Sequence, residues 1–162
     1  MTVESDALTG LLPRMTRLSA TLSRGQLFEH ATAAAGLALD RPAVTILLVL
    51  HMADRPLRVG EIAARMQVVG PHVTRQLQGL EREGLVERLA DPDDQRARLI
   101  TLTEPGRERI SGYLRVVNGW FADALSDWSD EDQRDLVRLF GRMVDDLSAH
   151  LDAVVGKGGA AG

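Results

Sequence analysis

The 162-residue chain has the length of one domain of ordinary size, and its composition excludes several classes of protein. No stretch approaches the roughly 18 consecutive apolar residues of a transmembrane helix. Residues 1–6 lack the basic and apolar regions of a secretory signal peptide. The sequence contains no cysteine, which excludes disulfides, thiolate metal sites and thiol redox sensing. We therefore expect a cytoplasmic protein with no membrane partner.

The net charge of −4 is unevenly distributed along the chain. Residues 55–109 carry 10 basic and 9 acidic side chains, whereas residues 110–162 carry 5 basic and 9 acidic ones. The middle of the chain is nearly neutral, so charge alone does not identify a nucleic-acid partner. Eighteen of the 19 basic residues are arginine, which can form forked contacts to phosphate or guanine.

The first third of the chain has the apolar spacing of helices. One helical pattern runs from residue 13 to residue 35 and ends at Gly36. Asp40 is then a predicted N-cap for a second, apolar helix that has Pro42 in its first turn. The turn at residues 54–56 is expected to end that helix.

Two short helices follow, over residues 59–67 and 71–83, and their arrangement predicts a helix-turn-helix. Apolar residues return at helical spacing on one face of each helix and are expected to be buried. These residues are Ile62, Ala63 and Met66 on the first helix, and Val73, Leu77 and Leu80 on the second.

The opposite face of the second helix carries donors and acceptors that can reach base edges. Arginine can fork onto guanine and glutamine onto adenine, and each good pair discriminates by about 1–3 kcal/mol. An ordinary amphipathic helix with a solvated polar face would have the same pattern, so this helix alone leaves both interpretations open. The candidate DNA-contacting residues are His72, Thr74, Arg75, Gln78 and Arg82.

Two runs of β-forming residues, at 85–89 and 98–103, predict a hairpin with a polar loop between them. A hairpin after a helix-turn-helix can act as a wing whose tip arginine enters the narrow minor groove. Arg96 lies at this tip and Arg98 begins the returning strand. Asp94 is spaced to hold the Arg96 guanidinium in place.

The sequence of this loop fits two other interpretations less well. The first is an acidic turn, because Asp91, Asp93 and Asp94 would repel phosphate unless they are paired. The second is a calcium-binding loop, which is excluded because the twelfth position from Asp91 is Leu102 rather than a bidentate acid.

The last third of the chain predicts two long helices. Thr103 is the expected cap of a helix from Glu104 to about Leu125, and Ser129, followed by three acids, begins the final one. Both have wide apolar faces, which suit either an intramolecular core or a homodimer; we expect a homodimer. The residues of these faces are Val116, Val117, Trp120, Phe121, Leu125, Leu136, Leu139, Phe140, Met143, Val144 and Leu147.

Several separate motifs, taken in order, resemble the MarR (multiple antibiotic resistance regulator) family. Residues 80–88, 91–96 and 102–106 are similar to the family patterns Leu-Glu-x-x-Gly-Leu-Val-x-Arg, Asp-Pro-x-Asp-x-Arg and Leu-Thr-x-x-Gly. The resemblance covers residues from about 10 to 152. It departs where Val69-Gly70-Pro71 replaces a common Ser-Pro, which leaves Gly70 as a weaker N-cap, and where Gln95 replaces one of two adjacent wing arginines.

The resemblance implies a mainly α fold with a small β-hairpin wing. Residues 37–103 would form a winged helix-turn-helix DNA-binding domain, and residues 9–36 and 104–154 the dimerisation helices. Residues 1–8 and 155–162 are expected to be a flexible N-terminus and tail.

The function implied by the resemblance is a transcription regulator that binds double-stranded DNA. It would be a ligand-responsive repressor that binds a pseudo-palindromic operator as a homodimer. His72, Thr74, Arg75 and Gln78 match the family's base- and backbone-contacting helix. Arg96 matches its minor-groove arginine and Asp94 the acid that orients it. Many relatives release DNA when a small aromatic or phenolic effector binds; the candidate pocket residues are Phe28, His30, His51, Tyr113 and Trp120.

Other functions find less support in the sequence. No motif of a hydrolase, metalloprotease or phosphate-binding loop is present, so no catalytic residue or cofactor is expected. The four histidines lack the short spacing of a zinc site, so no metal is expected. The remaining alternative is a winged-helix protein–protein adaptor that does not bind DNA.

Overall fold

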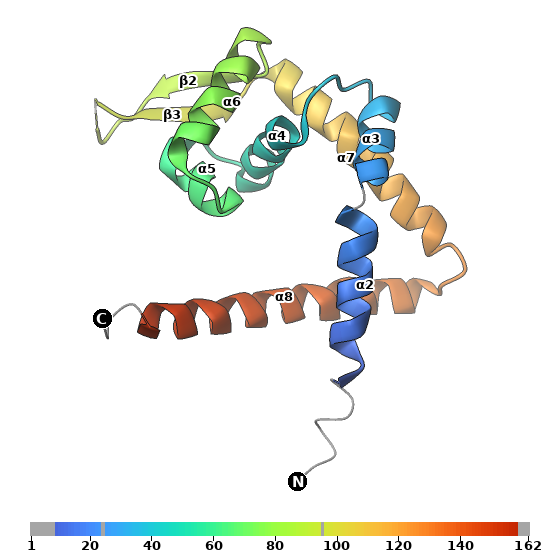
Figure 1. Cartoon of the computed structure of the whole chain (residues 1–162). Helices are drawn as coiled ribbons and strands as arrows, with labels where there is room; N and C mark the ends of the chain where they lie inside the picture. The colour runs from blue at the N-terminus through green and yellow to red at the C-terminus, as the bar shows by residue number, and fades with distance from the viewer. Residues whose placement is uncertain (1–8, 24, 95, 159–162) are drawn as a thin grey trace. The chain divides into compact units, whose positions relative to one another are not determined.

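The structure is a computed structural model that describes residues 9–23, 25–94 and 96–158 (Figure 1). These residues form two compact units, one up to Asn118 and the other from Gly119 onward. The expected mainly α fold with a small β-sheet is confirmed. In chain order the elements are α2 (Leu11–Ser23), α3 (Gly25–Ala34), α4 (Arg41–Ala53), β1 (Leu57–Arg58), α5 (Val59–Met66), α6 (Gly70–Arg82), β2 (Val86–Ala90), β3 (Arg98–Leu102), α7 (Glu104–Ala124) and α8 (Asp130–Gly158).

The single helix predicted over residues 13–35 corresponds to two helices, α2 and α3, on either side of residue 24. That residue lies outside the described part of the chain. The predicted stop at Gly36 is confirmed: this glycine has φ +65°, a left-handed conformation that L side chains rarely adopt.

Asp40 caps α4 as predicted. Its Oδ1 accepts a hydrogen bond of 2.9 Å from the amide of Ala43, and Pro42 lies in the first turn, where its missing N–H leaves no helical bond unmade. The helix ends at Asp54, which has φ 49°. Five apolar side chains of α4 are buried: Ala43, Val44, Ile46, Leu47 and Leu50.

The helix-turn-helix is confirmed, with both helices within one residue of their predicted limits. Ile62 and Ala63 are buried, and Met66 packs against the core. On α6 the predicted stripe of Val73, Leu77 and Leu80 is buried too, which anchors one face of this helix. The same core includes Leu37 before α4, Leu57 and Ile100 of the sheet, and Ile110 of α7.

The predicted hairpin is also confirmed and belongs to a sheet of three antiparallel strands in the order β1-β3-β2. Leu102 of β3 pairs with Val86 of β2, and the ladder continues to the Ala90–Arg98 pair near the tip. The two-residue strand β1 was not predicted. It pairs Leu57 with Ile100 and Arg58 with Leu99 on the other edge of β3.

Thr103 caps α7 as predicted and also joins α7 to the base of the hairpin. Its hydroxyl accepts a bond of 3.1 Å from the Gly106 amide and donates one of 2.6 Å to the Gly84 carbonyl. Gly106 passes so close to Leu85 that a Cβ at this position would lie 1.9 Å from the Leu85 carbonyl oxygen. Only glycine fits there, which explains the spacing of the Leu-Thr-x-x-Gly motif in physical terms.

Ser129 begins α8 as predicted: its Oγ accepts a hydrogen bond of 3.1 Å from the Asp132 amide, and acids occupy the first turn. The helix continues to Gly158, four residues beyond the expected limit at 154, so half of the predicted tail over 155–162 is helical. The predicted flexible segments 1–8 and 159–162 lie outside the described residues.

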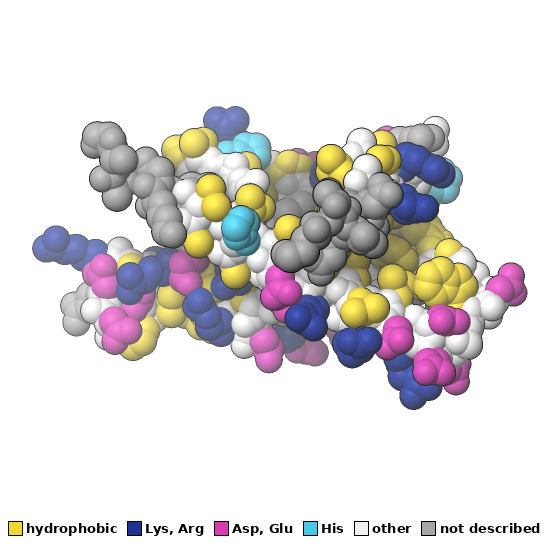
Figure 2. Space-filling model, turned by 90° about the horizontal axis from the view of Figure 1, so that it is seen from below, with side chains coloured by type: hydrophobic (Ala, Val, Ile, Leu, Met, Phe, Trp, Pro, Cys, Tyr) yellow, Lys and Arg dark blue, Asp and Glu magenta, His cyan; other side chains and the backbone are white. Residues whose placement is uncertain are grey.

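The helices α2 and α8 keep their apolar side chains largely exposed. No residue of α2 is buried, and the described side chains of α8 are exposed or half-buried. Hydrophobic side chains also lie among acidic and basic ones on the face shown in Figure 2. The exposed apolar residues are Leu12, Met15, Leu18 and Leu22 on α2, and Leu136, Val137, Leu139, Phe140, Val144, Leu147, Leu151 and Val154 on α8.

Candidate nucleic-acid interface

The polar face of α6 is presented to solvent because the opposite face is anchored in the core. Arg75, Gln78 and Arg82 are exposed at intervals of three and four residues, so they lie along one side of the helix. His72 is exposed as well. Thr74 differs: it is half-buried, and its hydroxyl donates to the Gly70 carbonyl at 3.1 Å, inside its own helix.

The start of α6 lacks a capping side chain. Val69, rather than the predicted Gly70, is the N-cap residue, and it makes no side-chain hydrogen bond to the helix. The Val69 side chain is 71% exposed beside the first turn, which contains Pro71. An apolar, β-branched residue thus stands at a position where serine, threonine, asparagine or aspartate is preferred.

Two side-chain contacts hold α6 in place from different elements. Gln76 donates from Nε2 to Asp40 Oδ2 at 3.1 Å, so the residue that caps α4 also contacts α6. Arg88 of β2 donates from Nε to both carboxylate oxygens of Glu81 at 2.9 Å. Sequence spacing did not indicate either contact, because each joins different elements.

The tip of the wing carries its predicted arginines in exposed positions. Arg96 and Arg98 are both exposed, and Arg98 donates from Nη1 to the Ala97 carbonyl at 3.0 Å. The predicted contact between Asp94 and the Arg96 guanidinium is not among the contacts of the described residues. Asp94 Oδ1 accepts a bond of 2.9 Å from the Arg96 backbone amide, and no ion pair between these two side chains occurs among the described residues. Asp94 therefore shapes the turn rather than the side chain.

Asp91 is the buried acid of the wing, and sequence reasoning had placed it only in an acidic turn. Its side chain is 3% exposed and forms an ion pair of 2.6 Å with Arg58 of β1. Its other oxygen accepts a bond of 2.9 Å from the Asp93 amide. The hydrogen bond from Arg58, and then that from the Asp93 amide, lower the pKa of the Asp91 carboxyl below its ordinary value. One of the three wing acids is therefore paired.

Of the four candidate pocket residues in the first compact unit, the structure brings two into contact. Phe28 and Tyr113 are in contact at a ring-centroid distance of 6.5 Å, and the Arg41 guanidinium lies 4.9 Å from the Phe28 ring. His30 is exposed, and its Nδ1 lies 2.6 Å from the Gln26 carbonyl. Trp120 belongs to the other compact unit.

His51 lines a separate hollow of about 140 Å³ between the end of α4 and the sheet. The two arginines that line this hollow are already engaged. Arg55 pairs with Glu61 at 2.7 Å, and Arg107 pairs with Glu104 at 3.0 Å and donates to the Leu102 carbonyl. The hollow therefore offers no cation that lacks a partner. The other lining residues are Leu50, Asp54, Pro56, Thr101 and Leu102.

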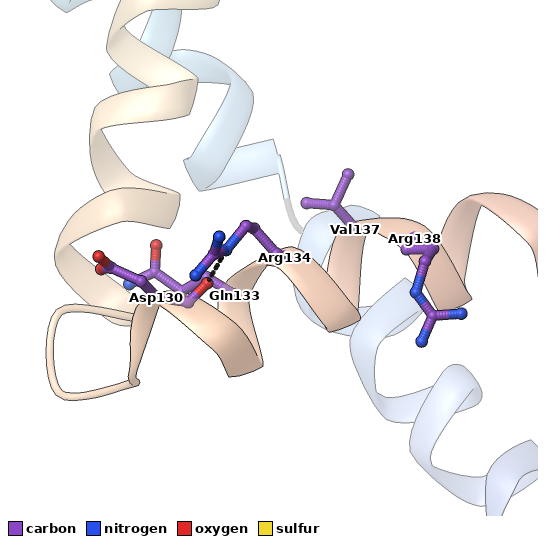
Figure 3. A pocket seen from close by; sticks show the side chains of 5 residues that line it. All are labelled: Asp130, Gln133, Arg134, Val137 and Arg138. Carbon is purple, nitrogen blue, oxygen red and sulfur yellow. Dashed lines mark hydrogen bonds between the residues drawn. The ribbon is translucent and has the colours of Figure 1, made fainter.

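An open hollow beside the start of α8 is lined by residues of that helix alone (Figure 3). Arg134 folds back and donates from Nε to the Asp130 carbonyl at 2.9 Å, and Val137 and Arg138 extend in other directions. None of the predicted pocket residues is among its lining, which Gln133 completes.

The described ranges contain neither a candidate metal site nor a candidate membrane span. Among residues 9–23, 25–94 and 96–158, no three or more acidic or histidine side chains are arranged to hold a metal ion. Within the same ranges, no helix combines the length and apolar character that a membrane crossing requires.

Known proteins resemble the chain over most of its length. Residues 39–97 match the family model described as the MarR family. An uncharacterised HTH-type transcriptional regulator of Bacillus subtilis, YdgJ, is 30% identical over 76% of this chain and 72% of its own. The HTH-type transcriptional repressor YetL of the same organism is 30% identical over 76% of this chain and 74% of its own.

Solved structures share the fold. A MarR family protein from Bacillus stearothermophilus has a TM-score of 0.75 at 22% identity and covers 89% of this chain and 97% of its own. The F27L variant of MepR from S. aureus, solved bound to an oligodeoxyribonucleotide, has a TM-score of 0.56 at 22% identity, covering 86% and 97%. At this identity the likeness establishes the fold.

Proposed function

The chain belongs to the MarR family of transcriptional regulators, and from this premise we propose that it is a repressor that binds double-stranded DNA sequence-specifically. The observation that carries the proposal is the two-sided character of α6. Val73, Leu77 and Leu80 fix one face in the core, while the exposed arginines and Gln78 occupy the other. A helix fixed in this way can place side chains against base edges without losing its orientation.

The wing supplies the second proposed contact. Arg96 is exposed at the tip, and its backbone amide is fixed by Asp94. An arginine in this position can enter the minor groove, whose narrow A·T-rich form attracts cations. The MepR variant with the same fold was solved with an oligodeoxyribonucleotide, which supports DNA as the partner. Repression is proposed because the relative YetL is a repressor.

We further propose that the chain acts as a homodimer on a pseudo-palindromic operator. The exposed apolar residues of α2 and α8 recur along each helix, whereas those of an ordinary surface are scattered singly. A second copy of the chain would cover them by two-fold symmetry. Two recognition helices would then read half-sites about 34 Å apart, one turn of DNA.

An aromatic or phenolic effector remains a proposal with one supporting contact. Phe28 and Tyr113 form an aromatic pair, and the guanidinium of Arg41 stacks on Phe28. An aromatic acid could stack on these rings and pair its carboxylate with Arg41. Titration of a DNA-bound complex with benzoate and phenol tests this: release by either compound in wild type, lost in Phe28→Ala, supports it. Equal release in both proteins contradicts it.

The experiment that tests DNA binding starts from duplexes selected out of a random pool, together with DNA flanking the protein's own gene. Fluorescence anisotropy then gives the affinity at two salt concentrations for wild type, Arg75→Ala and Arg142→Ala. Arg142 is the matched control, because it is an exposed arginine of α8, far along the chain from α6.

We expect Arg75→Ala to lose about 1–3 kcal/mol of discrimination at one base pair, roughly 5- to 150-fold, while Arg142→Ala binds like wild type. Affinity should fall steeply with salt, since each neutralised phosphate contributes a slope of about −0.9. Failure to select any duplex, or weak binding without salt dependence, would favour the adaptor function instead.

A further inference from the structure

The ion pair between Arg58 and Asp91 crosses the sheet near the end where β2 leads into the tip of the wing. Arg58 lies on β1, at one edge of the sheet, and Asp91 directly follows β2, at the other edge. The strand between them is β3, where Leu99 pairs with Arg58 on one side and with Leu89 on the other. Because neighbouring strands are about 4.8 Å apart, the arginine side chain must extend over β3 to reach the acid.

The contact combines a short hydrogen bond with an ion pair. The Nε and Nη2 atoms of Arg58 both lie 2.6 Å from Asp91 Oδ2. The carboxylate is buried, whereas the arginine side chain is 48% exposed. Charge-assisted hydrogen bonds of this length are the stronger ones in proteins. The buried acid also stays charged because its other oxygen accepts the Asp93 amide.

The same acid begins the turn that leads to the tip. Asp91 fixes the Asp93 amide, and three residues later Asp94 fixes the Arg96 amide in the same way, at 2.9 Å each. These two side-chain hydrogen bonds fix the backbone amides at Asp93 and at Arg96. A displacement of Asp91 would therefore be transmitted to the residue proposed to enter the minor groove.

We propose that Arg58 is a positioning residue for the wing: its ion pair with Asp91 across β3 fixes the loop that presents Arg96 to the minor groove. The inference rests on the proposed DNA-binding function. Arg58 then affects DNA binding through Asp91, and does not touch DNA itself. The loss of either partner should then have the same consequence, which a direct phosphate contact by Arg58 would not produce.

The test compares Arg58→Ala, Asp91→Asn and the double variant on the selected operator. Two quantities are measured for each: the preference for A·T over G·C in the flanks, and the preference for the correct base pair under α6. Guanine carries its N2 amino group in the minor groove, so the flank preference reports the wing. Arg55→Ala is the matched control, because it breaks the 2.7 Å pair with Glu61, which does not include the wing.

We expect wild type and Arg55→Ala to prefer A·T flanks roughly fivefold or more. Both single variants should lose most of this preference, as we also expect of Arg96→Ala, and keep the preference under α6. The double variant should be no worse than either single one, because the two residues act as a unit. Partial recovery in Arg58→Lys would agree with an ion pair.

Three results would overturn the inference. Weaker binding in Arg58→Ala but not in Asp91→Asn would make Arg58 a direct contact. Unchanged flank preference in both variants would remove the pair from DNA recognition. Equal loss of both preferences would mean that the pair only maintains the fold.

Hydrogen exchange of the free protein separates this inference from the proposed function. Both variants should exchange the amides of Asp93 and Arg96 at least several-fold faster than Arg55→Ala does, with helix amides unchanged. If wild type binds no duplex, the proposed function fails, and with it the role in DNA recognition, whatever the exchange shows. If wild type binds DNA but the amides of Asp93 and Arg96 exchange at wild-type rates in both variants, the inference fails and the proposed function stands.

Discussion

The helix-turn-helix region and the helices α2 and α8 use apolar side chains in different ways. In the first, residues such as Leu77 and Ile62 are fully buried, and the core is closed by side chains of the same unit. In the second, apolar residues recur at helical spacing but remain exposed, with Leu147 at 45% and Val137 at 73%. The first region can therefore fix the orientation of a reading helix by itself, whereas the second lacks a partner. Family membership and this contrast together support a second copy of the chain as that partner.

The largest expected effect separates the two regions directly. Leu77→Ala removes a fully buried side chain, so the free energy of unfolding should fall by about 2–5 kcal/mol at every protein concentration. Leu147→Ala is the matched control on α8, and its effect should shrink as the protein is diluted below the dimer dissociation constant, because the lost contact is between chains. Urea unfolding at two concentrations measures both. If both variants lost the same free energy of unfolding at both protein concentrations, the contrast between the two regions would be contradicted.

A charge on the exposed face of α8 should prevent self-association. Phe140 is 48% exposed, and Phe140→Glu would place a carboxylate on the face that we propose a second copy covers. We expect the dimer dissociation constant to rise roughly thirtyfold or more, the effect of losing an interface hot spot. Sedimentation velocity is the measurement, with Arg142→Glu as a control on the same helix. Two variants with identical sedimentation would argue against this face as the interface.

A substitution at the junction between the wing and α7 tests how closely the helix-turn-helix region is packed. Gly106→Ala should destabilise the fold by about 1–3 kcal/mol or more, because the new methyl group would overlap the Leu85 carbonyl. Gly112→Ala, in the same helix with no neighbour within 4 Å, should be neutral or stabilising by up to about 1 kcal/mol. Thermal unfolding of the pair measures the difference, and a neutral Gly106→Ala would contradict the packing described here.

The start of α6 offers a gain in stability. Val69→Ser would supply the missing cap of this helix, so the free energy of unfolding should rise by about 1 kcal/mol. The control is Val68→Ser, a replacement of the preceding, also exposed valine. Chemical unfolding checks the result. A loss of stability in Val69→Ser would mean that the valine makes a packing contribution larger than a cap.

The smallest expected effect is a pH dependence of the wing. The pKa of Asp91 is lowered below its ordinary value of 3.8 in the folded state, first by the hydrogen bond from Arg58. Such a group stabilises the folded protein above the ordinary pKa, and the contribution is lost as pH falls through the folded-state pKa. The stability difference between wild type and Asp91→Asn should therefore be constant near neutral pH and shrink below about pH 4. A difference that is constant down to pH 2 would contradict the ion pair.

Local patterns in the sequence were sufficient to predict much of the fold. The caps Asp40, Thr103 and Ser129 and the buried stripe of α6 each depend on residues within a few positions of one another. Such short-range chemistry is visible in a single sequence. The strand β1 was missed because two residues carry no periodicity, and it exists only through its pairing with β3.

The candidate site was predicted less completely. The exposed positions of Arg75 and Gln78 followed from helix geometry, but the ion pair of Arg58 and Asp91 joins residues 33 positions apart. The family resemblance suggested that Asp94 orients the Arg96 side chain, whereas the turn geometry directs its carboxylate to the nearer backbone amide. Of the residues named as one pocket, Phe28 and Tyr113 contact each other from different helices, whereas His30 contacts a carbonyl of its own helix and His51 lines a separate hollow.

One measurement tests the central claim that two copies of the chain read DNA together. Wild type is titrated into the selected operator and into the same duplex with about five base pairs inserted between the half-sites, which turns one half-site to the opposite face of the helix. We predict two chains bound per operator and a large loss of affinity on the altered duplex. Equal affinity for both duplexes, with one chain bound to each, would contradict the account.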